Sequence, residues 1–193
     1  ISIYRHKFPN YLFKKLWYNN KNFKRGVRKL ISVILAAGQG KRLGASLPKP
    51  LVQIGKKSMI EIIIDKLYKN FGEHKIYIVI NPATFNLFKE SLKKYSSLYY
   101  VAQPQPLGTA EALKCALGII ENDDDILLMY SDLVLISKKT LKDLAKFYES
   151  NQSHLTVLSG KTKIVYPYAL VKKDENGNLC ELNELAKPDF PPP

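Results

Sequence analysis

The sequence predicts an α/β protein with a Rossmann-like, three-layer α/β/α architecture. Apolar runs of four to six residues, typical of buried strands, alternate along the chain with segments of helical periodicity. This alternation predicts a mostly parallel (mixed) central sheet with helices on both faces. The first run, Ser32–Leu35, opens directly into the small residues and glycines of 36–40. A turn signal late in the chain adds a β-hairpin excursion outside the sheet.

The elements follow in chain order from this first strand. Segment 59–69 places four apolar residues on one helical face: Ile60, Ile63, Ile64 and Leu67. By the same criteria we expect strands at 75–80, 97–102, 125–130 and 155–159 and helices at 82–94, 109–120 and 138–150. The sequence Asp174–Asn178 predicts the turn of a hairpin over 168–184.

The charge distribution divides the chain at residue 30. The formal net charge is +13, but residues 1–30 hold nine Lys and Arg and no acidic residue, leaving +4 for the rest. We therefore expect a basic, aromatic-rich tail or linker at 1–30 and one principal domain at 31–193. The tail either contacts a preceding domain or binds an anionic surface, such as a membrane or RNA. We expect the domain itself to bind no nucleic acid.

The sequence shows no feature of a membrane protein, a cysteine metal site or a catalytic triad. No apolar run approaches the ~18 residues that cross a bilayer, and no signal peptide is recognisable, so a cytoplasmic location is expected. Cys115 and Cys180 lack metal-ligand spacing, the three histidines are scattered, and no nucleophilic triad is suggested. The sequence leaves the oligomeric state open.

The glycine loop after the first strand predicts a phosphate site. Glycines allow backbone N–H groups to approach an anion closely, and Lys41, Arg42 and Lys49 supply positive charge nearby. The spacing matches neither a P-loop nor the dinucleotide fingerprint, whose third glycine position is occupied by Leu43. A solvated glycine-rich turn is the alternative for this loop taken alone.

The full stretch, LAAGQGKRL followed by LPKPL, resembles the signature of the sugar-phosphate nucleotidyltransferases. It is most similar to the N-acetylglucosamine-1-phosphate uridylyltransferase domain of bifunctional enzymes that form UDP-N-acetylglucosamine. The resemblance implies that Arg42 and Lys49 are catalytic. It implies nucleotide contacts by Leu35, Ala36, Ala37, Gly38 and Gly40.

Two further motifs follow predicted strands and extend the resemblance. The stretch 103–112 contains Gln103, expected to read the base edge, with Gly108 and Thr109 completing the pocket. A proline-rich loop with a threonine cap is the alternative for this stretch. The stretch 129–135 contains Asp132, implied to be catalytic and a Mg²⁺ ligand, and Tyr130, implied to contact the sugar phosphate; a helix N-cap is the alternative for Asp132.

The resemblance implies that the predicted hairpin contacts the amino sugar through Ala169 and Glu184. Ala169 occupies a position where the family has glycine, and Glu184 one where it has glutamate. The resembling enzymes supply a second metal ligand beyond this point. We therefore expect the domain to be C-terminally truncated relative to the family.

These resemblances imply a Mg²⁺-dependent transfer of a nucleotidyl group from a nucleoside triphosphate, UTP first, to a sugar 1-phosphate, N-acetylglucosamine 1-phosphate first. Positioning and charge neutralisation suffice, because the attacking phosphate oxygen is already ionised. The alternatives are cytidylyl or thymidylyl transfer to another phosphorylated small molecule, or a nucleotide-binding module without turnover.

Overall fold

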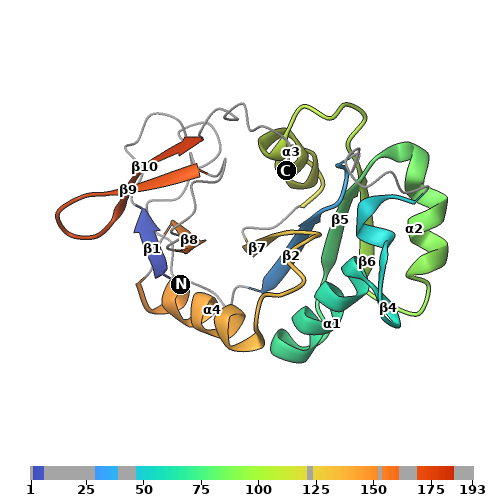
Figure 1. Cartoon of the computed structure of the whole chain (residues 1–193), viewed down its shortest axis with the longest axis horizontal. Coiled ribbons are helices and arrows are strands. Elements are labelled where there is room, and N and C mark those ends of the chain that lie inside the picture. Colours follow the sequence, from blue (N-terminus) through green and yellow to red (C-terminus); the bar gives the residue numbers. More distant parts are fainter. Residues whose placement is uncertain are drawn as a thin grey trace, which may run out of the picture. The chain divides into compact units, whose positions relative to one another are not determined.

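The computed structural model of the chain describes residues 2–6, 29–38, 47–120, 124–151, 154–160 and 169–184. Contacts divide the chain into two units (Figure 1). One unit covers 24–138 and contains the central sheet; the other combines 1–23 with 139–193.

Four parallel strands form the central sheet, in the order β6-β5-β2-β7. They are β2 (Leu30–Leu35), β5 (Ile76–Ile80), β6 (Leu98–Ala102) and β7 (Asp125–Tyr130). The chain proceeds outward from β2 through β5 to β6 and then returns to the opposite side of β2. The strand order therefore reverses between β2 and β7. In open α/β sheets, ligands bind beyond the carboxyl ends of the strands at such a reversal.

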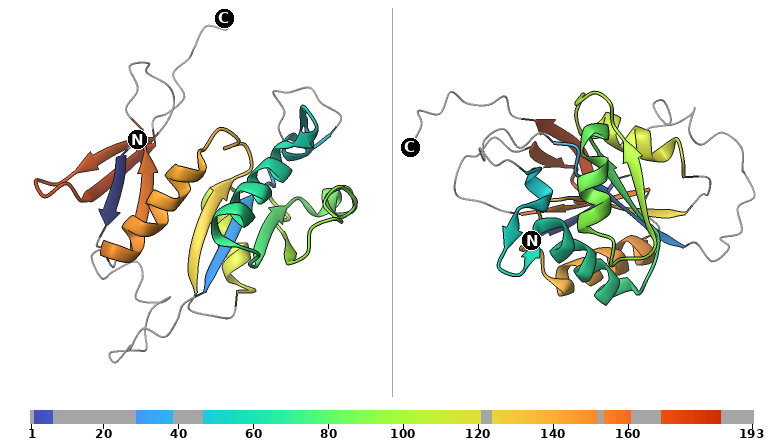
Figure 2. Two further views of the ribbon diagram at one scale, coloured as in Figure 1. Left: turned by 90° about the horizontal axis from the view of Figure 1, so that it is seen from below. Right: turned by 90° about the vertical axis from the view of Figure 1, so that its right-hand side faces the viewer.

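Helices cover both faces of this sheet, as the alternating pattern predicts. Helix α1 (Met59–Phe71) and helix α3 (Thr109–Leu117) lie on opposite faces (Figures 1 and 2). Helix α1 follows a 3-10 turn, η2 (Lys49–Leu51), and a short β-ribbon of β3 (Gln53–Ile54) and β4 (Lys57–Ser58). These layers confirm the α/β class.

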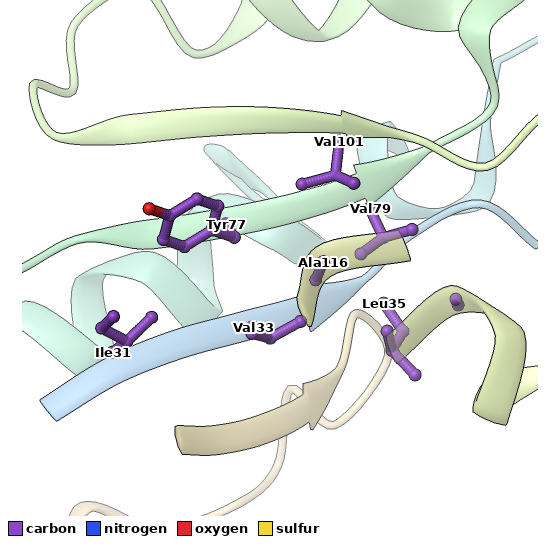
Figure 3. Packing of buried hydrophobic residues seen from close by; sticks show 8 residues of the cluster. Ile31, Val33, Leu35, Tyr77, Val79, Val101 and Ala116 are labelled. Atoms are coloured by element: carbon purple, nitrogen blue, oxygen red, sulfur yellow. The ribbon is translucent and has the colours of Figure 1, made fainter. Parts of the chain in front are cut away.

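The alternating side chains of the strands explain the two covered faces. Figure 3 shows Ile31, Val33 and Leu35 of β2 on the face that α3 covers. The cluster there also contains Tyr77, Val79, Val101, Ala112 and Ala116. Ile34, Ile76 and Ile78 alternate with these residues and are fully buried as well. A strand apolar on both faces is stable only between two layers, which fixes the sheet as the rigid centre of this unit.

Predicted and observed bounds differ most at the helix expected over 82–94. It consists of a 3-10 turn, η3 (Pro82–Thr84), followed by α2 (Phe85–Ser91). The side chain of Asn81 accepts a hydrogen bond from the N–H of Ala83, which favours the tight first turn. Helix α3 stops at Leu117, just before Gly118, rather than at residue 120.

The other unit contains helix α4 (Lys138–Asn151) and two antiparallel strand pairs. Strand β1 (Ser2–His6) pairs with β8 (Leu155–Ser159), and β9 (Ala169–Lys173) pairs with β10 (Leu179–Glu184). The second pair is the predicted hairpin, with Gly177 in its turn at φ +78°. Residues 7–28 of the expected tail lie outside the described residues, so the boundary at residue 30 stays a prediction.

None of the described helices combines the length and the apolar character that crossing a bilayer requires. Both cysteines are free thiols: Cys115 is half-buried and Cys180 is exposed.

A buried carboxylate secures the start of α1. Glu61 Oε2 accepts hydrogen bonds from the N–H and the hydroxyl of Ser58, at 2.7 and 2.8 Å. Its Oε1 lies 2.5 Å from the ammonium of Lys94. Burial by itself raises the pKa of Glu61, but the contacts with Lys94 and Ser58 outweigh burial and hold this pKa below its ordinary value. The ionised form of Glu61 therefore stabilises the fold.

We expect Glu61→Gln to lower the free energy of unfolding by about 1–2 kcal/mol at pH 7 because it removes a charge-assisted contact. The folded-state pKa lies below the unfolded value of 4.5, so this stabilisation is complete above pH 4.5 and is lost as the pH falls through the folded-state pKa. Urea unfolding at pH 7 and pH 3 measures it. Glu90→Gln, which changes an exposed ion pair on α2, is the control; equal effects of the two variants at pH 7 would contradict the assignment.

Candidate active site

The loop after β2 presents free backbone donors at the carboxyl edge of the sheet. The N–H of Ala36 still donates to Val79 O at 2.8 Å and so belongs to the sheet. Among the described residues, no backbone or side-chain acceptor meets the N–H groups of Ala37 and Gly38. Leu35 and Ala36 are buried, whereas Gly38 is exposed. Successive open N–H groups at a strand end can donate to an anion.

An ion pair crosses the point at which the strand order reverses. The Lys49 Nζ donates to Asp132 Oδ2 at 2.7 Å, although the residues are 83 positions apart. Lys49 begins the 3-10 turn after the glycine loop, and Asp132 lies two residues beyond β7. Their side chains are 36% and 47% exposed. Ion pairs this open to water contribute at most about 1 kcal/mol, so each partner is available to a ligand.

The third strand end connects to the same edge through α3. Gln103, immediately after β6, is buried, and its Nε2 donates to Gly108 O at 3.2 Å. Gly108 has φ +103°, a conformation that favours glycine, and it precedes the first residue of α3, Thr109. The hydroxyl of Tyr130, at the end of β7, lies 3.5 Å from Thr109 Oγ1. The base-pocket motif therefore reaches the motif that contains Asp132.

The structure thus brings together most of the predicted site residues of the sheet unit. Gly40 and Arg42 lie outside the described residues, and their roles stay predictions. Ala169 and Glu184 are paired residues of the β9–β10 hairpin in the other unit. Their assignment to a sugar pocket also stays a prediction.

The residues present fit a Mg²⁺ ion that is held jointly with a phosphate. The described part of the chain contains no group of three Asp, Glu, His or Cys side chains that could form a complete cage. However, Mg²⁺ typically takes one or two carboxylates and fills its other positions with water and substrate phosphate oxygens. The exposed Asp132 carboxylate, at the same edge of the sheet as the loop after β2, provides this kind of donor.

Lys66 is a residue of this region that the sequence does not single out. Its ammonium, on α1, contacts backbone carbonyls of the loop that follows Asp132. A lysine on an amphipathic helix normally faces water, so only the tertiary contact distinguishes it.

Comparisons with known proteins are consistent with this geometry. The profile of a family described as nucleotidyl transferase matches residues 31–193. The bifunctional protein GlmU of Caldicellulosiruptor saccharolyticus is 32% identical over 158 residues, which cover 81% of this chain and 34% of the relative. The proteins of the same name from Coxiella burnetii and Thermosipho melanesiensis are 32% and 34% identical over 79% and 78% of the chain, and 32% of each relative.

The chain spans about a third of the length of these curated relatives. Among solved structures, the crystal structure of Rv0371c from Mycobacterium tuberculosis is similar with a TM-score of 0.52 and 18% identity. The match covers 65% of this chain and 62% of that one, and it supports the α/β fold.

The glycine loop yields a test that separates folding from binding. A methyl group at Gly38 would meet no described atom within 4 Å, so we expect Gly38→Ala to change stability by less than about 0.5 kcal/mol. The same methyl group would occupy the space of a phosphate, and we expect the affinity for a nucleoside triphosphate to fall by about tenfold or more. Thermal unfolding and titration calorimetry measure the two effects.

Gly72→Ala is the control for this experiment. Gly72 follows the end of α1 at φ +73°, where a side chain is strained. We expect this variant to lose about 1 kcal/mol of stability and to keep its affinity. Unchanged affinity in Gly38→Ala would remove the loop from the binding site.

Proposed function

Because the chain belongs to the nucleotidyl transferase family, we propose that it transfers UMP from UTP to the phosphate of N-acetylglucosamine 1-phosphate or a closely similar sugar 1-phosphate. One observation carries the proposal. The ion pair of Lys49 and Asp132 and the open N–H groups of Ala37 and Gly38 lie at the same carboxyl edge of the sheet, where the strand order reverses. This edge combines the donors, the cation and the carboxylate that a Mg²⁺ triphosphate requires.

Binding of the triphosphate begins at the glycine loop. The N–H groups of Ala37 and Gly38 donate to phosphate oxygens without placing a formal charge inside the sheet. The Lys49 ammonium is the nearby mobile charge. Since its bond to Asp132 is exposed and weak, Lys49 exchanges the carboxylate for a phosphate oxygen when the nucleotide enters.

Asp132 is the residue that would hold the metal. A Mg²⁺ ion held there would neutralise charge on the phosphates and polarise the α-phosphorus. The loss of the Lys49 contact leaves Asp132 Oδ2 available as a ligand. Nucleotide and metal binding are therefore coupled through the same ion pair.

Gln103 is the residue that we propose for base recognition. Its Nε2 is held by Gly108 O, which fixes the orientation of the amide and leaves Oε1 as an acceptor. Uracil and thymine carry a ring N–H at the edge that pairs, whereas the corresponding ring nitrogen of cytosine is an acceptor. The Oε1 acceptor can pair with that ring N–H, which supports uridine or thymidine triphosphate as the nucleotide.

The reaction needs no nucleophile from the protein. An ionised oxygen of the sugar 1-phosphate attacks the α-phosphorus in line, a new P–O bond forms, and the bond to the β-phosphate oxygen breaks. Pyrophosphate leaves with the electron pair of that bond. Lys49 and the loop N–H groups stabilise the charge that accumulates on the phosphate oxygens.

Pyrophosphate release with Mg²⁺ tests the substrates directly. UTP, dTTP, CTP and ATP are each combined with N-acetylglucosamine 1-phosphate and with a panel of other sugar phosphates. We expect release with UTP and N-acetylglucosamine 1-phosphate to exceed that of the other pairs. Turnover with a different pair would correct the substrates, and nucleotide binding without turnover by any pair would identify a binding module instead.

We expect Asp132→Asn to lower kcat by about 100-fold or more, since the neutral amide is a poor Mg²⁺ ligand. The affinity of the variant for UTP without metal should change little, because the loop and Lys49 remain. Steady-state kinetics over a range of Mg²⁺ concentrations measure the effect. Asp143→Asn, which removes the carboxylate of an exposed ion pair with Lys139 on α4, is the matched control; a similar loss in both variants would exclude a specific role for Asp132.

A further inference from the structure

The loop of residues 131–137 carries Asp132. Its first residue, Ser131, is buried, and Val134 and Ile136 are half-buried. Asp132 and Leu133 are exposed, and Leu135 is 94% exposed. Hydrophobic burial therefore holds only part of this loop. The N–H of Ser131 ties the start of the loop to Leu35 O of β2, at 3.2 Å. Beyond it, the N–H of Leu133 donates to Tyr130 O at 3.3 Å, and that of Ile136 donates to Leu133 O at 3.2 Å.

One side chain from another element binds this loop at two points. The Lys66 ammonium donates to the carbonyl oxygens of Val134 and Ile136, the latter at 2.9 Å. These contacts span 68 and 70 residues of sequence. One turn further along α1, Asn70 Nδ2 donates to Lys138 O at 3.2 Å, just after the loop. Helix α1 therefore holds three carbonyls of the segment that leads away from Asp132.

Helix α1 is a rigid support for these contacts. Its neighbouring residues Ile63, Ile64 and Leu67 are fully buried against the sheet unit. Partial burial lowers the pKa of Lys66, and the charge of Lys138 adds to this effect. A desolvated ammonium gains most from strong acceptors, which the two loop carbonyls supply.

We propose that Lys66 is a positioning residue for Asp132. By binding the carbonyls of Val134 and Ile136, it fixes the loop so that the carboxylate stays at the edge of the sheet, within reach of Lys49 and of an incoming cation. In this role Lys66 contacts neither Lys49 nor the cation. The inference rests on the proposed function for its catalytic consequence and on the loop geometry for its structural one.

The structural consequence is tested without substrates. Hydrogen exchange of the Leu133 and Ile136 amides should be about tenfold faster in Lys66→Met than in the native protein, because methionine keeps the length but donates no hydrogen bond. The ¹³C shift of the Asp132 carboxylate should move with it, since the distance to the Lys49 ammonium changes. Lys69→Met, an exposed lysine on the same helix, should change neither.

The catalytic consequence is a change in kcat and in the Mg²⁺ requirement without a matching change in KM for the nucleotide. In Lys66→Met, kcat should fall by about tenfold and the half-saturating Mg²⁺ concentration should rise, while KM for the nucleotide stays within about twofold. Lys66→Arg, which retains donors, should recover most of kcat. A similar change in Lys69→Met would reduce the effect to general destabilisation and overturn the inference.

The outcomes distinguish a failure of the positioning role of Lys66 from a failure of the proposed function. Unchanged exchange at Leu133 and Ile136 in Lys66→Met overturns the positioning role, and so does faster exchange with unchanged kcat. If the native protein shows no turnover with any substrate pair, the proposed function fails. The exchange rates and the Asp132 shift then decide by themselves whether Lys66 positions this loop.

Discussion

The parallel pairing of β2 with β7 is the constraint on which the candidate site depends. In this register Leu35 lies opposite Tyr130, and the N–H of Ser131 donates to Leu35 O at 3.2 Å. Both strands therefore end at the same edge and at the same height. The glycine loop after β2 and the carboxylate after β7 become neighbours because of this register. A shift by one residue would turn Tyr130 to the opposite face and displace Asp132 from Lys49.

The sheet provides rigidity, and the polar groups lie at its edge. Its strands are apolar on both faces and are covered by α1 on one side and α3 on the other. Charges within such a layer would be costly, whereas loops at the carboxyl edge keep their donors and carboxylates open to water. The exposed pair of Lys49 and Asp132 is consistent with this division. Helix α1 has two structural roles, since it covers the sheet and also contacts the loop after β7 through Lys66.

The residues proposed to bind the phosphates and the base all belong to one unit of the chain, which contains the loop after β2, Lys49, Gln103 and Asp132. The β9–β10 hairpin with Ala169 and Glu184 belongs to the other unit. The family profile extends over both units, while the curated relatives are about three times as long as this chain. Under the proposed function, the sheet unit would supply the contacts to the nucleotide, and the hairpin of the other unit would contribute to recognition of the acceptor.

The sequence by itself determined the class of fold, most element positions and the family. Apolar runs such as Ile76–Ile80, bounded by polar residues, are typical of buried strands, and the motif around Gly38 is specific in its residues and spacing. It could not determine which strand lies beside which, because pairing depends on contacts between residues far apart in the chain. Only the tertiary structure decided that Lys49 meets Asp132 across 83 residues and that Lys66 binds the loop beyond it. The sequence around a lysine on a helix surface does not reveal what its ammonium will contact. The partner of Lys66 is decided by how helix α1 packs against the sheet and the loop after β7.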